Sequence, residues 1–321
     1  MADAINISMV YFSHRDFLLL GFPGFHKSRH LLFIPFFIVY LVILVTNGLI
    51  IHTVRAESSL HAPMYVLISS LSAVNICSTT TIVPKMLLGF LFHQNHISLD
   101  GCLVQMFFIY CTTMLDCNIL LMMALDRYVA ICRPLRYSKI MTKQKLVLLS
   151  IMALVRCTFT VFPVIYLASR VNFCKSNIIR HFACEHMALL SLACSNITKN
   201  KIMGLIIRVI DLLIDMSLLS FSYGSILRVA LTMSNDATRH KSLHTCGTHI
   251  LVILIVYFFR MSSSIVYRVS RSVSQDTHNL LTAMYLLIPA LVNPIIYGLR
   301  AKEIRIRMLK IFHQKTIFTN R

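Results

Sequence analysis

Charged side chains stand inside or beside long apolar stretches of this sequence. Asp126 and Arg127 are adjacent near the end of one stretch, Asp116 stands inside the same stretch, and Arg260 stands inside another. Charges at such positions in a membrane-length apolar run are costly, so they indicate a functional site. They could bind a charged group or exchange one ion partner for another. The sequence shows no nucleophile beside a base and no metal-ligand spacing, which argues against an enzyme and a metal site.

Long apolar runs recur along the chain and must position these charges. Of the 321 residues, 57% are hydrophobic and 13% are charged, whereas soluble domains carry roughly twice that charged share. Seven runs have the ~20 apolar residues that a helix needs to cross a bilayer. The sequence therefore predicts an all-α membrane protein, a seven-transmembrane helix bundle (residues 31–299) within a single domain, residues 1–321. The predicted spans are residues 31–53, 64–92, 102–132, 146–168, 202–231, 246–267 and 280–299.

The basic residues indicate how the bundle is oriented. The net charge of +19 could suit a nucleic-acid-binding protein, but Lys and Arg stand in short segments between the apolar runs, where orientation signals lie. The segments after the odd-numbered runs hold more of them, so we expect residues 1–30 outside the cell and the tail, residues 300–321, in the cytoplasm. We expect a multi-pass plasma-membrane protein, targeted by its first span without a cleaved signal peptide and without a nucleic-acid partner.

Two terminal segments carry further signals. Residues 301–312 can place apolar side chains on one broad face and cations on the other, which predicts a short interfacial helix in contact with membrane lipid. Asn6 begins an Asn-Ile-Ser triplet, which is a glycosylation acceptor if this segment lies outside the cell. A chance match is the alternative for so short a motif.

Several short motifs, in order along the chain, resemble those of the olfactory receptors, a branch of the rhodopsin-like G-protein-coupled receptors. Residues 120–137 read LLMMALDRYVAICRPLRY and resemble the family's MAxDRYVAICxPLRY. The other matching segments are LHAPMY at 60–65, PKML at 84–87, KSLHTCGTH at 241–249 and PALVNPIIYGLR at 289–300. GFPG at 21–24 and IPF at 34–36 resemble the class I, or fish-like, branch.

This resemblance implies a function as well as a fold. A receptor of this kind binds a small organic odorant between its helices and activates an olfactory stimulatory G protein, which raises cyclic AMP. A non-olfactory sensor of a metabolite acid is an alternative that tissue location would decide. A membrane transporter is a further alternative, but the sequence shows no internal repeat of the kind that many transporters carry.

The resemblance also implies an activation switch toward the cytoplasmic ends of the helices. In rhodopsin-like receptors the arginine of the Asp-Arg-Tyr motif is held when the receptor is inactive and released toward the G protein. The implied switch residues are Asp126, Arg127, Tyr128, Tyr257, Asn293, Pro294 and Tyr297. A purely structural ion pair at Asp126 and Arg127 is one alternative. The other is a simple kink at Pro294, because proline removes a backbone donor from the helix.

Four of the ten cysteines match the family's pattern on the outer side. The resemblance implies a Cys102–Cys184 disulfide that pins the second outer loop over the helices, and a Cys174–Cys194 disulfide that closes this loop on itself. Disulfides persist in the oxidising compartment that an outer loop faces. Reduced thiols are the alternative for both pairs.

An ion site is a further implication, but this chain departs from the family there. In the family an acid at the position of Asp116 helps to hold a sodium ion, together with an aspartate on the second span. The matching second-span residue is Asn75, which removes one negative charge. A bound sodium ion at Asp116 and Asn75 is therefore one expectation, and a hydrogen bond between these two side chains is the other. No other cofactor is expected.

One face of the sixth predicted span carries polar residues. Tyr257, Arg260, Ser264 and Arg268 recur every three or four residues, so they share a helix face. The resemblance implies that Arg268 holds carboxylated odorants, and a guanidinium matches a carboxylate in bidentate geometry. An arginine that snorkels to the interface is the alternative.

Arg260 lies deeper in the same span and needs a partner, either the ligand or Asp211 of the fifth span. Because Asp211, Asp215 and Arg208 crowd that span, an internal salt-bridge network is an alternative. The resemblance further implies ligand contacts by two third-span residues and by His186 in the second outer loop, with core packing as the alternative for each. The predicted ligand-binding residues are Tyr110, Thr113, His186, Arg260, Ser264 and Arg268.

Overall fold

The computed structural model describes residues 13–92, 95–269, 273–300 and 303–307 of the chain. Within these ranges, the side chains of residues 26, 27, 241, 263, 264, 266–269, 299 and 300 fall outside the described set. The predicted glycosylation site at Asn6 therefore lies outside the described residues. The same holds for the side chains of Ser264 and Arg268, although their backbone belongs to a described helix.

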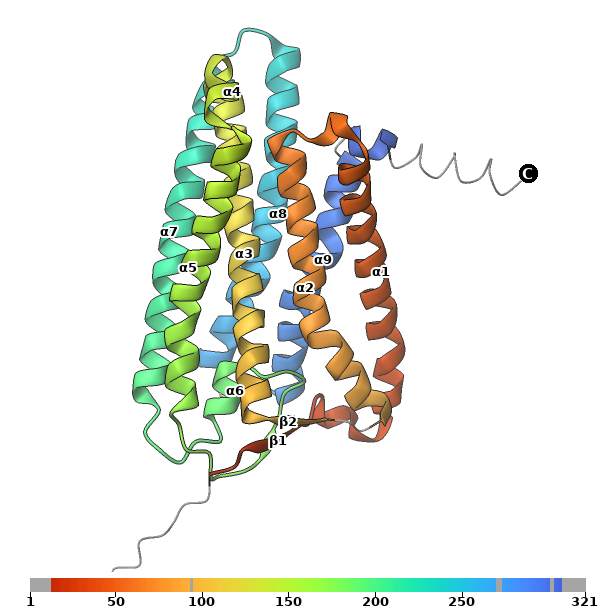
Figure 1. The fold of residues 1–321 in the computed structure, drawn as a ribbon, viewed down its shortest axis with the longest axis vertical. Helices are drawn as coiled ribbons and strands as arrows, with labels where there is room; N and C mark the ends of the chain where they lie inside the picture. Colours follow the sequence, from red (N-terminus) through yellow and green to blue (C-terminus); the bar gives the residue numbers. More distant parts are fainter. Residues whose placement is uncertain (1–12, 93–94, 270–272, 301–302, 308–321) are drawn as a thin grey trace, which may run out of the picture.

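Seven long helices form the bundle that the apolar runs predict. They are α1 (Arg29–Ala56), α2 (Pro63–Phe92), α3 (Leu99–Cys132), α5 (Lys143–Ser169), α7 (Thr198–Leu231), α8 (Asp236–Val269) and α9 (Gln275–Arg300). Figure 1 shows them side by side along the long axis of the molecule. Each contains its predicted span and continues past it, because the backbone hydrogen bonds of a helix need no apolar side chains beyond the hydrocarbon layer.

Composition alone identifies six of these helices as candidate membrane spans within the described residues. The seventh is α7, which has 34 residues but carries Arg208, Asp211 and Asp215 in its middle. Short elements connect the long helices. They are η1 (Pro23–Ser28), η2 (Ser58–Leu60), η3 (Pro134–Arg136), α4 (Tyr137–Ile140) and α6 (His186–Leu190).

Helix α3 is the most enclosed of the candidate spans, whereas α1 and α5 are largely exposed. It contacts α2, α5, α7 and α8, so it connects most of the bundle. The exposed side chains of the outer helices include Val45 of α1, Phe159 of α5 and Phe221 of α7. An apolar exterior of this kind suits lipid rather than water.

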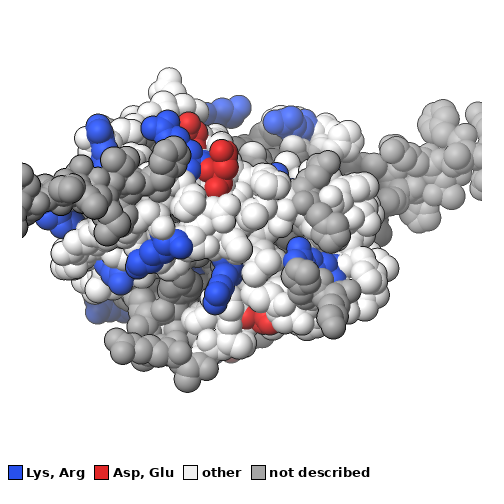
Figure 2. All heavy atoms as spheres, turned by 90° about the horizontal axis from the view of Figure 1, so that it is seen from below, with Lys and Arg blue, Asp and Glu red and all other residues white. Residues whose placement is uncertain are grey.

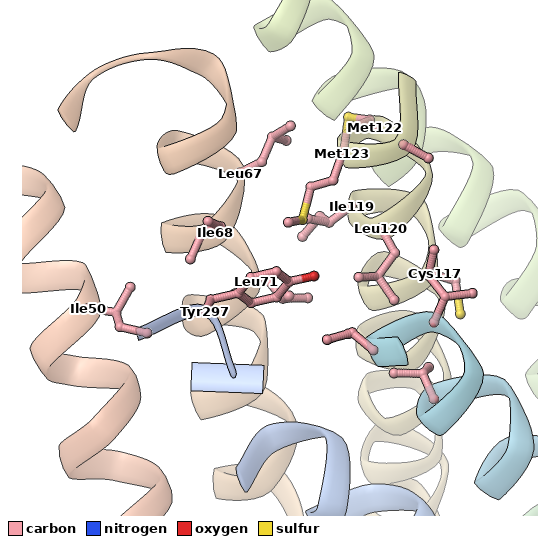
Figure 3. Close-up of a cluster of buried hydrophobic side chains, with 14 of the residues drawn as sticks. Ile50, Leu67, Ile68, Leu71, Cys117, Ile119, Leu120, Met122, Met123 and Tyr297 are labelled. Carbon is pink, nitrogen blue, oxygen red and sulfur yellow. The ribbon is translucent and has the colours of Figure 1, made fainter. Parts of the chain in front are cut away.

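A large cluster of buried apolar side chains joins α1, α2, α3 and α9. Ile50, Leu71, Leu120, Met123 and Tyr297 are among its members, and Figure 3 shows Tyr297 lying among the side chains of α2 and α3. Lipid tails are as apolar as leucine, so this cluster stabilises the bundle through close van der Waals packing more than through removal of surface from water.

A small sheet and α6 cover one end of the bundle, which we name the capped end. The strands are β1 (Asp16–Leu19), β2 (His96–Ser98) and β3 (Ile178–Ile179), in the order β2-β1-β3. Strand β1 pairs antiparallel with β2 and parallel with β3. This sheet is not among the elements predicted from the sequence, since its strands have two to four residues and lack a periodic signal.

The opposite end, which we name the Arg127 end, carries α4 and the start of the predicted interfacial helix. Residues 303–307 are helical, and Ile304 is fully buried. Tyr65 Oη donates to Glu303 Oε2 at 2.8 Å, and Arg307 Nη1 lies 3.2 Å from Glu57 Oε2. These contacts attach the segment after α9 to the ends of α1 and α2.

Candidate functional site

A cavity, here named the main cavity, lies between the long helices just beneath the cap. Helices α3, α5, α7, α8 and α9 form its walls, and residues 181–187 form its roof. It contains about 1140 Å³ of space not filled by atoms, counted out to its open mouth. A concave, largely apolar site with a few polar groups is the usual form of a small-molecule pocket.

Two disulfides hold the roof in place. Cys102 of α3 bonds Cys184 with a Cα–Cα distance of 5.3 Å, and Cys174 bonds Cys194 at 5.7 Å. The backbone N–H of Cys184 also donates to Gln105 Oε1 at 2.9 Å. Both cysteine pairs implied by the resemblance are therefore joined, and the first fixes the roof directly to α3.

Polar contacts between α3 and α6 complete the roof. Glu185 caps α6, because its Oε2 accepts from the backbone N–H groups of Met187 at 2.8 Å and Ala188 at 2.9 Å. Tyr110 Oη donates to Glu185 Oε1 at 3.3 Å and accepts from the backbone N–H of His186 at 3.1 Å. Tyr110 thus connects α3 to the roof while it lines the main cavity. Glu185 is not among the residues predicted from the sequence.

His181, a second buried imidazole in the roof, also lines the main cavity. Its Nδ1 lies 2.9 Å from the carbonyl oxygen and 3.1 Å from the backbone nitrogen of Ala183, and its ring stacks on Phe182 with centroids 4.5 Å apart. Burial lowers the pKa of His181 from 6.5 to about 4, because desolvation disfavours the charged imidazolium. The ring is therefore neutral at physiological pH.

Four of the six predicted ligand-binding residues line this one cavity, namely Tyr110, Thr113, His186 and Arg260. The Thr113 hydroxyl donates to the Ile109 carbonyl at 2.7 Å. The side chains of the other two, Ser264 and Arg268, are outside the described set. Contact of these residues with a ligand stays a prediction. Tyr285 of α9 and Arg208 of α7 also line the cavity.

A cluster of charged and polar groups, here named the charge cluster, lies beside the cavity wall. Arg156 of α5 donates through Nη1 to Asn118 Oδ1 at 2.8 Å, and through Nη2 to Asp211 Oδ1 at 3.0 Å and Asp215 Oδ1 at 3.1 Å. Asp211 and Asp215 are four residues apart on α7, so they share a face and can take one cation between them. Arg156 is not among the residues predicted from the sequence, although a lone cation inside the fourth apolar run was a usable signal.

Helix α8 joins the charge cluster through Tyr257. Tyr257 Oη donates to Asp215 Oδ2 at 2.8 Å, so both oxygens of this carboxylate are bound. The internal salt-bridge network considered from the sequence is therefore present, but Arg156 supplies its cation and not Arg208. The cluster links α3, α5, α7 and α8.

Arg260 has a different environment. Its Nη1 donates to Cys117 Sγ at 2.9 Å, and no carboxylate among the described residues lies within ion-pair distance of it. The suggested partner Asp211 is bound to Arg156 instead, so that suggested pairing is wrong for the described structure. Arg260 faces the main cavity and also a smaller cavity below it.

Asp116 lies in this smaller, lower cavity with Ser78, Thr113 and Arg260. Its Oδ1 has no hydrogen-bond partner among the described residues. Among the described residues, Asn75 is not hydrogen-bonded to Asp116. Its Nδ2 donates instead to Asn47 Oδ1 of α1 at 3.0 Å. The set fits a sodium ion poorly, since a single carboxylate shares its cavity with the fixed positive charge of Arg260. The described residues hold no group of three His, Cys, Asp or Glu side chains suited to a metal ion.

At the Arg127 end, Asp126 is fully buried and holds two side chains. Arg127 Nε donates to Asp126 Oδ2 at 3.0 Å, and Tyr137 Oη donates to Asp126 Oδ1 at 2.7 Å. Burial and the neighbouring Asp126 carboxylate raise the pKa of Tyr137, so this phenol stays a donor. Tyr128 packs on Phe221 of α7 with ring centroids 5.8 Å apart. Arg127 is thus held by its own neighbour on α3.

Three of the remaining predicted switch residues, Asn293, Pro294 and Tyr297, lie on α9. Tyr223 Oη and His249 Nδ1 are hydrogen-bonded, and the His249 ring lies 6.3 Å from the Tyr297 ring, centroid to centroid. The Tyr297 hydroxyl and the Asn293 amide nitrogen are buried without a hydrogen-bond partner among the described residues. Pro294 stands within α9, and the helix continues past it. The switching role of these residues stays a prediction.

Comparison with known proteins agrees with the motifs. The family model for olfactory receptors matches residues 36–315. Olfactory receptor 52D1 of Homo sapiens is 40% identical over 298 residues, which cover 92% of this chain and 94% of that protein. Olfactory receptor 51E2 of Mus musculus is 38% identical over 306 residues, covering 95% and 96%. Olfactory receptor 51E1 of Homo sapiens is 38% identical over 300 residues, covering 94% of each.

Proposed function

The chain belongs to the olfactory receptor family, and from this premise we propose that it binds a small organic odorant in the main cavity and activates an olfactory stimulatory G protein that raises cyclic AMP. Its relatives carry the names of olfactory receptors, and the chain is accordingly a receptor and not an enzyme. The observation that supports this cavity as the binding site is its position. It lies under a roof fixed by a disulfide and against helices that meet in the charge cluster.

The proposal includes an orientation for the bundle. The capped end faces the outside of the cell, where an oxidising medium preserves its two disulfides. The Arg127 end faces the cytoplasm, since the segment after α3 carries Arg133, Arg136 and Lys139 and basic loops favour that side. Residues 300–321 then form the cytoplasmic tail.

Ligand binding acts on the equilibrium between two receptor states. A ligand shifts this equilibrium only by its difference in affinity for the two states. A guest in the main cavity touches α7 and α8 close to the Tyr257–Asp215 hydrogen bond, which holds these helices together. Weakening that contact lets α8 move away from α3 at the Arg127 end. Arg127 then leaves Asp126 and reaches the G protein.

Arg127→Ala tests this scheme in cells that express the full chain with the olfactory G protein. We expect the odorant-driven rise in cyclic AMP to disappear while part of the variant still reaches the cell surface, because Tyr137 still donates to the buried Asp126 carboxylate. Tyr166→Phe is a matched control on the exposed face of α5. A normal cyclic AMP response from surface-expressed Arg127→Ala would contradict the proposed switch.

A further inference from the structure

A small cavity, here named the α1–α2 pocket, lies at the capped end beside the roof of the main cavity. Its walls come from residues 19–21, from α1 and α2, and from Phe182 of the roof. It contains about 280 Å³ of space not filled by atoms, counted out to its mouth. Pockets for drug-sized ligands hold roughly 300 to 1,000 Å³, so this one suits a single small ion better than an odorant.

Arg29 is the first residue of α1 and lines this pocket. Its side chain is deeply buried, since the residue is only 7% exposed. The buried Nε has no hydrogen-bond partner among the described residues, and none of their carboxylates lies within ion-pair distance of Arg29. A buried charge without a partner is costly. Arg29 therefore needs an anion that the described part of the chain does not supply.

The start of α1 adds positive charge around Arg29. The aligned backbone dipoles of a helix leave a partial positive charge at its N-terminus. This helix has no acidic residue in its first turn, and its N-cap residue, Ser28, makes no capping hydrogen bond through its side chain. An arginine is unfavourable at this end of a helix, whereas a bound anion is favourable there.

Lys85 of α2 is a second cation that lines the α1–α2 pocket. It is partly exposed and forms no ion pair with a described residue. Asn95 adds a neutral donor, since its Nδ2 gives one hydrogen to the Leu19 carbonyl at 3.0 Å and an amide carries two. No Asp or Glu is among the described residues that line the pocket. Its polar side chains thus offer donors and positive charge to a guest.

We infer that the α1–α2 pocket binds one small inorganic anion, with the size and single charge of chloride, between the side chains of Arg29 and Lys85. The inference goes beyond the proposed function, because the site lies outside the main cavity and takes no odorant. The ion joins the start of α1 to α2 and to the residues that follow β1. It therefore stabilises the attachment of the cap to the bundle.

The pocket is also connected to the roof of the main cavity. Phe182 and Phe90 belong to its walls, and both pack on Phe22, with ring centroids 5.9 Å and 6.3 Å from the Phe22 ring. The neighbours of Phe182 in the chain, His181 and Ala183, line the main cavity. An ion in the α1–α2 pocket therefore helps to hold the roof from the side opposite to the odorant.

The outer surface of the cap agrees with an anionic guest. Figure 2 views the capped end and shows more Lys and Arg side chains than Asp and Glu side chains on this face. A surface of one predominant sign raises the local concentration of ions of the opposite sign. Small anions are therefore favoured over cations before they reach the pocket.

Thermal unfolding of the purified full-length receptor in phosphatidylcholine nanodiscs tests the inference without an odorant or a G protein. Chloride replaces isethionate, a larger organic anion, step by step at constant ionic strength and pH. We expect the unfolding temperature to rise with chloride and then to level off, because an ion that binds the folded state alone stabilises it by mass action. An equal unfolding temperature in the two salts would overturn the inference.

Arg29→Gln and Lys85→Gln should each raise the half-maximal chloride concentration about tenfold or more. Without chloride, Arg29→Gln should be at least as stable as the wild-type protein, because it removes a buried cation that has no partner. Arg170→Gln is the matched control, since Arg170 is exposed at the end of α5 and contacts Tyr166. If Arg29→Gln fails to fold, Lys85→Gln carries the test. The chloride dependence of the control in both variants would overturn the inference.

Broadening of the chloride-35 resonance by the receptor measures binding directly. We expect the wild-type protein to broaden the line more than Arg29→Gln does, whereas equal broadening would mean an adventitious ion only. In phospholipid-free detergent, stabilisation by added phosphatidylcholine that requires Arg29, with no effect of chloride, would assign the pocket to a lipid phosphate and overturn the inference. Chloride binding by a receptor that gives no cyclic AMP response would contradict the G-protein proposal and support this site.

Discussion

Arg156 and Arg260 are both guanidinium groups inside the apolar part of the bundle, but their surroundings differ. Arg156 reaches Asp211, Asp215 and Asn118 within 3.1 Å. Arg260 has a thiol acceptor and a cavity in front of it. The comparison shows that the residue type does not set the role of a charge in the membrane. A cation whose anion comes from the same chain is structural, whereas one that faces a cavity is available to a guest.

Helix geometry accounts for the difference. Asp211 and Asp215 lie one turn apart on α7 and turn toward α5, so one arginine can bind both. Tyr257 adds a hydrogen bond from α8 on the other oxygen of Asp215. One turn away from Tyr257 along α8, Arg260 turns toward the cavity.

Arg156→Met should have the largest effect and would break the comparison from its structural side. Removing one partner of a buried ion pair leaves uncompensated charge and costs about 3 to 5 kcal/mol. We therefore expect loss of surface delivery and a large fall in the unfolding temperature. Both are measured with Arg170→Met as control, because Arg170 is exposed at the end of α5 and contacts Tyr166. Wild-type stability of Arg156→Met would show that the charge cluster does not support the fold.

Lowering the pH should have the next largest effect on stability. It acts through His181 in the roof of the main cavity and not through the charge cluster. The pKa of His181 is about 4 in the folded protein and 6.5 ordinarily, so the unfolded chain binds more protons between these values. The free energy of unfolding should therefore fall as the pH drops from 6.5 toward 4, by about 3 kcal/mol at pH 4.

The control for this prediction is His181→Asn, whose amide offers both a donor and an acceptor to the Ala183 backbone but does not titrate. Thermal unfolding between neutral and acid pH measures the dependence in both proteins. An equally steep loss of stability in wild type and His181→Asn would assign the acid sensitivity to other groups.

Tyr257→Phe should have a smaller effect. It tests the hydrogen bond that joins α8, which carries Arg260, to the charge cluster around Arg156. It removes the hydrogen bond between α8 and the Asp215 carboxylate but leaves the ion pair with Arg156, a loss of about 1.5 to 3 kcal/mol. Because α8 is then held less firmly, we expect basal cyclic AMP per receptor at the surface to rise. Basal activity equal to that of Tyr166→Phe would mean that this bond does not restrain α8.

Arg268→Ala should have the smallest effect of the series. The backbone of Arg268 lies next to the last residue of α8, and an ion pair formed in contact with water contributes about 0.2 to 1 kcal/mol. Responses to carboxylic acids should therefore weaken severalfold or less while responses to alcohols stay nearly unchanged. Concentration–response curves for both ligand series measure this. An equal loss for acids and alcohols would remove Arg268 from the carboxylate contact.

The long helices could be predicted from the sequence because membrane-length apolar runs are local signals. The two disulfides followed from a family resemblance, and Cys102–Cys184 then placed His186 at the cavity as expected. The small sheet could not be predicted, because two to four residues per strand carry no periodicity.

Partners inside the bundle were the least predictable feature. Arg260 had Asp211 as a reasonable partner by sequence, but Arg156 takes it. Asn75 was expected near Asp116 but bonds to Asn47 of α1. These choices depend on how each helix is rotated and on which neighbour it meets, and neither quantity is encoded in the period of a single helix.

The central claim is that filling the main cavity at the capped end opens the bundle at the Arg127 end. Spin labels at Leu135, which is almost fully exposed after α3, and at Arg239, near the start of α8, would report this directly by pulsed electron resonance. The account predicts that the distance between the labels lengthens when an odorant that stabilises the receptor is added. An unchanged distance with the odorant bound would contradict it.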